Sequence, residues 1–312
     1  STNMATSMNL LDEKHITNAF VYIDGEQMNN IVSLHLDQEF GQHHKFKEVL
    51  DYDVAGNNFM GSLSEQIELV GQTLDIDLQQ GNDSGKVYEF RGIIDNVYNE
   101  GSEGKHGHLV IEGSSPTQLL ERGKRLDIFA NMTLQDVVGE VINGVNEDVL
   151  PIVNSPIYSV PINFLMQYYE SDWEFLQRLS AISGETLFYT GRDLVFGEYK
   201  DWAASEVMYD RELITVQFGS RLLANTFTHY QYLPGKDDTL YQESSESVEN
   251  SNEYLDIAAK KSAGMVSDRP TLLPSSLYVE DKGALEDLVE RRKTGTAART
   301  IYVKGVSKTC DP

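Results

Sequence analysis

The chain has 312 residues, enough for two or three domains that each bury a hydrophobic core. Hydrophobic residues make up 40% of it and aromatic residues 10%, as in folded globular proteins and unlike disordered chains. Asp and Glu number 49 against 25 Lys and Arg, and the resulting net charge of −24 disfavours binding to nucleic acid or to anionic membranes. This charge either keeps the chain soluble or complements a partner with a positive face.

The single cysteine, Cys310, excludes a disulfide framework or a Cys-based zinc site within one chain. No apolar run approaches the roughly 20 residues of a membrane helix. The first residues lack the basic and apolar regions of a secretory signal. We therefore expect cytoplasmic assembly, with no signal peptide and no membrane span.

Residues 18–112 read as a series of β-strands joined by turns. Asp24 and Gly25 predict a turn, and a short helix is expected to begin within residues 62–66. Residues 74–78 alternate apolar and polar side chains, as in a half-buried strand. This pattern favours an antiparallel barrel or sandwich.

Helices are expected after residue 114. Ser115, followed by Pro116, predicts the N-cap of a short helix, and Thr133 predicts the cap of a second helix that ends near Gly144. Residues 148–163 contain three prolines and are interpreted as an extended segment.

The helix signal is most complete within residues 167–199. Ser171 is the predicted N-cap, Glu174 completes a capping box three residues later, and Gly184 supplies the stop. A hairpin is expected around Gly191 and Arg192. The helix should pack in the core through an apolar stripe, which comprises Trp173, Phe175, Leu176, Leu179 and Ile182.

Beyond residue 207 the chain is expected to return to strands, first within residues 213–235. The acidic segment 239–256 predicts a loop, and residues 284–293 predict a helix. A last strand is expected within 300–308. Because the sequence stops directly after it, we expect the chain to be a piece of a longer protein.

No motif for catalysis or cofactor binding is present: there is no phosphate-binding loop, dinucleotide fingerprint, nucleophile elbow or HExxH sequence. His35, His43 and His44, or His106 and His108, are candidate metal ligands, although ordinary exposed histidines are the simpler interpretation. The abundant carboxylates leave open a hydrolase that uses paired carboxylates or a metal. We predict no catalytic, cofactor-binding or metal-binding residue.

The run QYYESDWEFLQRL, residues 167–179, resembles the VgrG family, the spike proteins of type VI secretion systems, which are related to baseplate hub proteins of contractile phage tails. The signature residues are Glu170, Ser171, Asp172, Trp173, Glu174, Phe175, Leu176, Arg178 and Leu179. The order of elements elsewhere is also similar, at residues 90–92, 119–120, 125–129 and 136–137. The resemblance covers roughly residues 18–312.

The resemblance implies an α+β fold of the phage-tail hub type, with two similar antiparallel β-barrel domains and an intervening α+β region. The first barrel, which would face the tube, is expected at residues 1–113. The intervening domain would comprise 114–202 plus 251–293. The second barrel would comprise 203–250 plus 294–312, with the start of an OB-fold at its C-terminal end.

The resemblance further implies a structural hub and not an enzyme. Three chains would form a homotrimer whose six barrels match a hexameric, Hcp-like tube protein, with other spike or baseplate components and effectors as further partners. Contraction would deliver this assembly out of the cell. The hub of a contractile phage tail or a related injection particle is the alternative.

Overall fold

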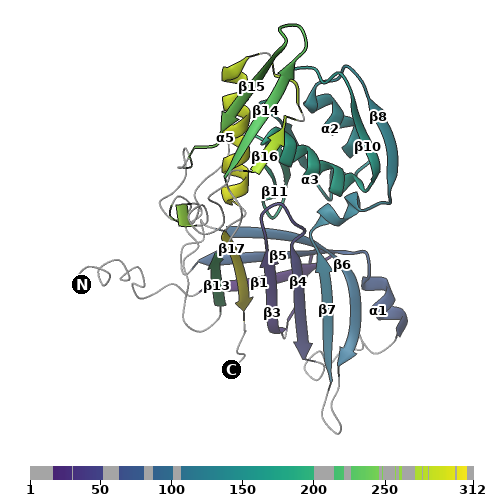
Figure 1. Ribbon diagram of the computed structural model, residues 1–312. Helices are drawn as coiled ribbons and strands as arrows, with labels where there is room; N and C mark the ends of the chain where they lie inside the picture. The colour runs from purple at the N-terminus through teal and green to yellow at the C-terminus, as the bar shows by residue number, and fades with distance from the viewer. Residues whose placement is uncertain are drawn as a thin grey trace, which may run out of the picture.

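The structure is a computed structural model. It describes residues 17–29, 31–51, 63–80, 87–100, 107–199, 214–220, 226–245, 248, 257, 260–261, 271–275, 277–279, 281–298 and 301–307. Figure 1 shows a curled β-sheet in the lower part of the molecule and a mixture of helices and small sheets above it. The α+β fold class predicted from the sequence is confirmed.

The lower part is a nine-stranded sheet in the order β13-β17-β3-β4-β7-β6-β5-β1-β2, in which every neighbouring pair is antiparallel. The strands are β1 Thr17–Ile23, β2 Glu26–Gln27, β3 Ile31–Gln38, β4 Lys45–Asp51, β5 Thr73–Gln80, β6 Val87–Glu100, β7 His108–Ser114, β13 Ile214–Ser220 and β17 Ile301–Ser307. Strands β3, β4 and β7 lie in front, and other strands of the sheet cross behind them (Figure 1). The described pairings leave β13 and β2 as edges, so this barrel is not strictly closed.

The alternation predicted for β5 is confirmed, because Leu74 and Ile76 have no exposed surface and lie on the inner face. Asp24 and Gly25 both have positive φ, 49° and 79°, and form the predicted turn between β1 and β2. Gly92 leaves room for an aromatic ring, since a Cβ atom there would lie 2.3 Å from the Phe46 ring.

The upper part holds three smaller sheets and most of the helices. The sheets are β8 Arg125–Phe129 with β10 Leu165–Glu170; β9 Ile152–Ser155, β11 Leu187–Tyr189 and β12 Leu194–Gly197; and β14 Phe227–Leu233, β15 Asp238–Glu243 and β16 Thr271–Pro274. The helices are α1 Leu63–Leu69, which lies beside the lower sheet, the 3-10 helix η1 Pro116–Leu120, α2 Leu134–Ile142, α3 Asp172–Ser183 and α5 Lys282–Ala298. Helix α3 is central and contacts α2, α5, η1, β10 and β11 (Figure 1). One continuous hydrophobic cluster runs from the lower sheet through α2 and α3 to α5.

Several local predictions need correction. Ser115 is the N-cap and Pro116 follows it as predicted, but Pro116–Leu120 is a 3-10 helix and the Ser115 side chain makes no capping hydrogen bond. The acidic segment expected to be a loop begins as strand, because β15 extends to Glu243 and pairs with β14. Helix α5 runs beyond the predicted range 284–293 at both ends. Most of residues 239–270 beyond β15 lies outside the described residues.

The predicted domain boundaries stay a prediction. Strand β17 pairs with β3 through Val303–Ser307, and β13 pairs with β17. Strands on both sides of those boundaries therefore share one sheet. In the described part of the chain, no helix is long and apolar enough to cross a membrane.

Candidate functional site

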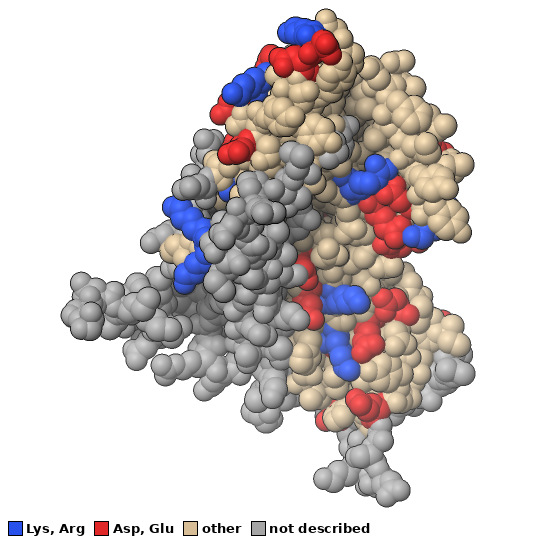
Figure 2. All heavy atoms as spheres, in the orientation of Figure 1, with Lys and Arg blue, Asp and Glu red and all other residues tan. Residues whose placement is uncertain are grey.

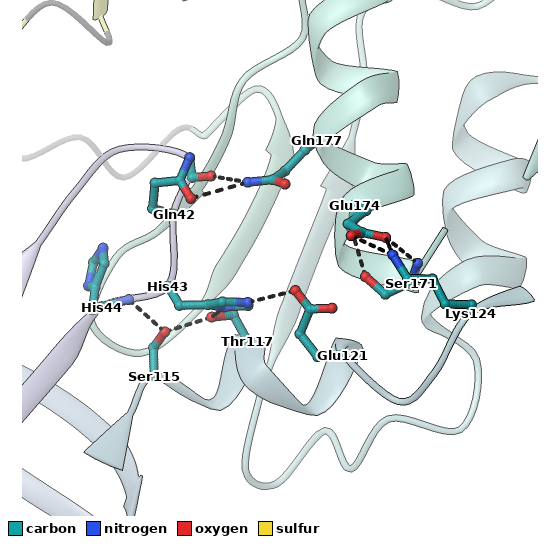
Figure 3. Close-up of polar contacts among 11 residues, drawn as sticks. Gln42, His43, His44, Ser115, Thr117, Glu121, Lys124, Ser171, Glu174 and Gln177 are labelled. Atoms are coloured by element: carbon teal, nitrogen blue, oxygen red, sulfur yellow. Dashed lines mark hydrogen bonds and ion pairs between the residues drawn. The ribbon is translucent and has the colours of Figure 1, made fainter. Parts of the chain in front are cut away.

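The N-terminus of α3 carries the capping box that the sequence predicted. The Glu174 N–H donates to the Ser171 hydroxyl at 3.1 Å, and the Ser171 N–H donates to the Glu174 carboxylate at 2.8 Å. Lys124, in the loop before β8, reaches the same carboxylate at 2.7 Å, as Figure 3 shows. The Lys124 hydrogen bond, followed by the Ser171 backbone bond, lowers the pKa of Glu174. The capping box thus also attaches this loop to α3.

The other charged signature residues attach α3 to its neighbours. Asp172 is 1% exposed and accepts hydrogen bonds from Arg122 at 2.6 Å and from Gln167 at 3.0 Å. Arg178 binds both oxygens of Glu170, at 2.7 and 2.9 Å. These contacts connect α3 to strand β10 and to the segment that follows η1.

The apolar signature residues lie in the core, as predicted. Leu176 and Leu179 have no exposed surface. The Phe175 ring stacks on Phe129 of β8 at a centroid distance of 5.7 Å. Trp173 is 2% exposed and stacks on His43, from the β3–β4 turn, at 4.5 Å. Helix α3, which lies in the upper part, therefore contacts both β8 beside it and the β3–β4 turn of the lower sheet.

A chain of hydrogen bonds continues from His43 into η1 (Figure 3). The His44 N–H donates to the Ser115 hydroxyl at 3.0 Å, and the Ser115 and Thr117 hydroxyls lie 2.6 Å apart. Thr117 Oγ1 lies 2.7 Å from His43 Nδ1, and His43 Nε2 lies 3.2 Å from Glu121. Because an ionised Glu121 only accepts, we assign the His43 proton to Nε2, and each hydroxyl then donates to the next group.

This Thr–His–Glu arrangement resembles the order of groups in nucleophilic hydrolases. Thr117, however, has no exposed surface, and its hydroxyl is shared between Ser115 and His43. Burial lowers the pKa of His43 more than Glu121 raises it, so the imidazole is neutral at neutral pH. The chain of hydrogen bonds accordingly joins the β3–β4 turn to η1, with no surface where a substrate would reach Thr117.

The candidate metal ligands that the structure describes do not form a metal site. His44 is buried, which together with the neighbouring His43 lowers its pKa to about 4. His35 lies opposite Lys47 on the neighbouring strand, and His106 lies outside the described residues. Within the described residues, no group of three or more His, Cys, Asp or Glu could hold a metal ion.

Two features of the structure were missed from the sequence. Glu48 is fully buried without a hydrogen-bond partner, although it reads as an ordinary polar strand residue. The outward face of β8 and β10 is apolar and exposed. The alternation of Leu126 and Ile128 with Arg125 and Asp127 predicts a strand but, taken alone, would place the apolar side chains inward, so the sequence carries no signal for their exposure.

Comparison with known proteins adds one family match. Residues 62–200 match the family model described as phage tail baseplate hub (GPD), a range just under half of the chain. It runs from α1 through the β11–β12 hairpin and contains all the signature residues. No curated protein matches the chain.

Solved structures match a larger part of the chain. A tail protein from Neisseria meningitidis MC58 aligns with a TM-score of 0.52 and 13% identity, covering 87% of this chain and 74% of its own. The 43 kDa tail protein of prophage MuSo2 from Shewanella oneidensis aligns with a TM-score of 0.51 and 13% identity, covering 91% and 80%. An E. coli type VI secretion component gives a TM-score of 0.43 and 14% identity, covering 64% of this chain and 56% of its own.

The chain therefore has the fold of tail hub-like proteins. More particularly, its central region is similar to the phage tail baseplate hub. This match confirms the relation to hub proteins that the signature residues predicted.

Proposed function

We propose that this chain is the structural hub of a contractile injection machine, at the base of a puncturing spike. The observation that carries the proposal is the baseplate hub match over residues 62–200, set within a fold shared with tail proteins. The contacts of α3 support a mechanical role, because buried charges and stacked rings join the lower sheet to the upper part. A component that transmits force needs such fixed connections.

In this role three copies form a ring with pseudo-six-fold symmetry that docks onto a hexameric, Hcp-like tube. Closed cyclic symmetry limits the assembly to a finite size. The net charge of −24 supports a docking partner with a complementary positive face. Other spike or baseplate components and effectors complete the assembly, which forms in the cytoplasm and leaves the cell on contraction.

A type VI secretion spike is the leading form of this proposal, and the hub of a contractile phage tail is the second. The second is favoured by the similarity to a prophage tail protein. Both assign the chain a structural and not an enzymatic role.

Electron microscopy of the full chain, mixed with hexameric tube protein, tests the proposal. The expected result is a three-fold cap on the ends of six-fold rings. Bovine serum albumin in place of the hub controls for non-specific decoration of the ring ends. The proposal would be contradicted if tube rings stayed uncapped at a large excess of the chain and the purified chain hydrolysed a glycan.

A further inference from the structure

The outward face of the β8–β10 sheet is apolar and exposed. Leu126 and Ile128 on β8 are 65% and 64% exposed, and Tyr168 on β10 is 69% exposed. Leu126 lies opposite Tyr168, and Ile128 lies opposite Met166. Directly opposite residues share a face, so these side chains form one surface, which Phe164, 59% exposed, extends at the start of β10. We call this surface the β8–β10 face.

The sheet that carries this face has two strands, whereas isolated two-stranded sheets are marginally stable. Its opposite face packs in the core through Phe129 and Leu165. A bulge between Tyr168 and Glu170 gives Tyr169 a φ of 55°, and this tyrosine is 74% exposed. Bulges of this kind re-aim side chains. As a result, the successive residues Tyr168 and Tyr169 are both exposed on β10.

The charges beside the face are paired within the chain. Lys124 bonds to Glu174, Arg125 lies 3.5 Å from Asp172, and Arg178 bonds to Glu170. Figure 2 shows few charged atoms on the visible surface at the upper right, beside a cluster of basic and acidic side chains lower down. Two copies that each carry −24 repel one another over most of their surface, but not where the charges are balanced.

A second apolar face lies on the β14–β15 hairpin. Tyr232 and Tyr241 are 52% and 58% exposed, and Tyr230 lies opposite Tyr241 on the same side. The hairpin also carries three exposed carboxylates, those of Asp237, Asp238 and Glu243. Its inner side is buried against α5. We call this surface the β14–β15 face. In Figure 1 the two faces belong to different elements of the upper part, with β8 at its right edge and β15 at its top.

We propose that the β8–β10 face of one copy packs against the β14–β15 face of the next copy in the ring. The inference rests on the proposed hub function and specifies which surfaces form the ring. A cyclic trimer needs a heterologous interface, which joins two different patches of the same chain. Tyrosines suit the core of an interface. Lys124 and Arg125 at the rim are nearly half exposed, so the carboxylates of the hairpin can add to the pairing that Glu174 and Asp172 already give them.

Two variants and one matched control test this pairing by light scattering and analytical ultracentrifugation of the full chain. Ile128→Glu disrupts the β8–β10 face, and Tyr241→Glu disrupts the β14–β15 face. Ile67→Glu on α1 introduces the same charge at a residue that is 61% exposed, away from both faces. A circular dichroism spectrum like that of the unmodified chain and a cooperative melting transition establish that each variant folds; a lower melting temperature is expected where the trimer is lost.

We expect the unmodified chain and Ile67→Glu to form trimers, and each interface variant to be a monomer. A mixture of the two interface variants should form dimers but not trimers. In such a pair, the intact β8–β10 face of Tyr241→Glu meets the intact β14–β15 face of Ile128→Glu, and the remaining faces are both disrupted.

Three results would overturn the inference. A trimer that survives either substitution places the interface elsewhere. Disruption by Ile128→Glu alone indicates that the β8–β10 face pairs with itself. A monomeric unmodified chain excludes pairing between copies and leaves the face to a different partner. The hub proposal is judged separately, because a chain that is monomeric on its own but still forms three-fold caps on tube rings would retain it.

Discussion

Glu48, in the middle of β4, is the residue whose setting is least expected for its type. Its side chain has no exposed surface and lies between Leu34 of β3 and Ile111 of β7. Neither carboxylate oxygen has a hydrogen-bond partner. Burial raises the pKa of Glu48 to about 8, so the side chain is protonated and neutral in the folded chain at neutral pH.

This setting predicts a pH-dependent stability. The pKa in the folded chain lies above the unfolded value of 4.5, so the unfolded state releases the proton first as pH rises. The contribution of Glu48 is fully present below pH 4.5 and is lost as pH rises to about 8, with a slope of up to about 1.4 kcal/mol per pH unit. Urea unfolding of the unmodified chain and of Glu48→Gln between pH 5.5 and 7.5 measures it. As pH rises, the unfolding free energy of the unmodified chain should fall relative to that of Glu48→Gln. A difference between the two that stays constant with pH would refute the raised pKa of Glu48.

At the N-terminus of α3, the hydroxyl of Ser171 accepts a hydrogen bond from the Glu174 N–H, which has no partner within the helix. Ser171→Ala should therefore lower the free energy of unfolding by about 0.5–2 kcal/mol without changing binding to any partner. Chemical denaturation measures the loss. Ser171→Thr, whose hydroxyl can cap in the same way, is the control and should retain most of the stability. An unchanged unfolding midpoint in the alanine variant would mean that the cap contributes nothing.

Among the elements, the crossing of α3 and α5 depends on a glycine. Gly184 ends α3 with a φ of 71°, and a Cβ atom there would lie 2.6 Å from the backbone nitrogen of Arg292 in α5. A side chain at this position therefore needs an unfavourable φ and separates the two helices. The stop signal was readable in the sequence, but the close approach to α5 was not.

Gly184→Ala and Gly295→Ala should change stability in opposite directions. The first should lower it by about 1–3 kcal/mol through overpacking and strain. Gly295 lies inside α5 with open space around it, so alanine there should raise stability by about 0.5–1 kcal/mol through helix propensity. Melting temperatures of the two variants provide the comparison. Equal effects of the same sign would contradict the close approach of the two helices.

Elements specified by local signals were predictable from the sequence, and long-range arrangements were not. The cap and stop of α3 and the turn at Gly25 depend on residues a few positions apart. The pairing of β17 with β3 joins strands more than 260 residues apart, and no local pattern encodes it. The error at β15 has a different cause: its partner β14 is the preceding strand of the same hairpin, and its polar and acidic residues hid the strand.

In the candidate site, too, features with local sequence signals were predictable and features that depend on distant residues were not. The signature around Ser171 identified the helix that joins the parts of the molecule, and burial of its apolar residues followed from their spacing. The attachment of Trp173 to His43 depends on a turn 130 residues away in the sequence. Exposure of the β8–β10 face depends on which side of the sheet is covered, which a strand of five residues does not reveal.

For the whole molecule, the dominant electrostatic fact is the net charge of −24. Each association of two copies brings like charges together, whereas the proposed contact between copies is largely apolar. The exposed ion pairs at its rim are individually worth little. Long-range repulsion should therefore oppose the trimer at low ionic strength, where the Debye length is about 30 Å at 0.01 M salt and about 10 Å at 0.1 M.

Salt should consequently have opposite effects on the two assembly steps. Raising sodium chloride from about 0.02 to 0.5 M should strengthen the trimer, measured as a lower dissociation constant in sedimentation equilibrium, because repulsion is screened while apolar burial persists. The same change should weaken docking of the trimer on a tube with a positive face, measured by binding of tube rings to immobilised hub. Repeating the series with potassium acetate separates screening from effects specific to chloride. A trimer that weakens with salt would indicate an interface held by ion pairs, in conflict with an apolar contact between the β8–β10 and β14–β15 faces.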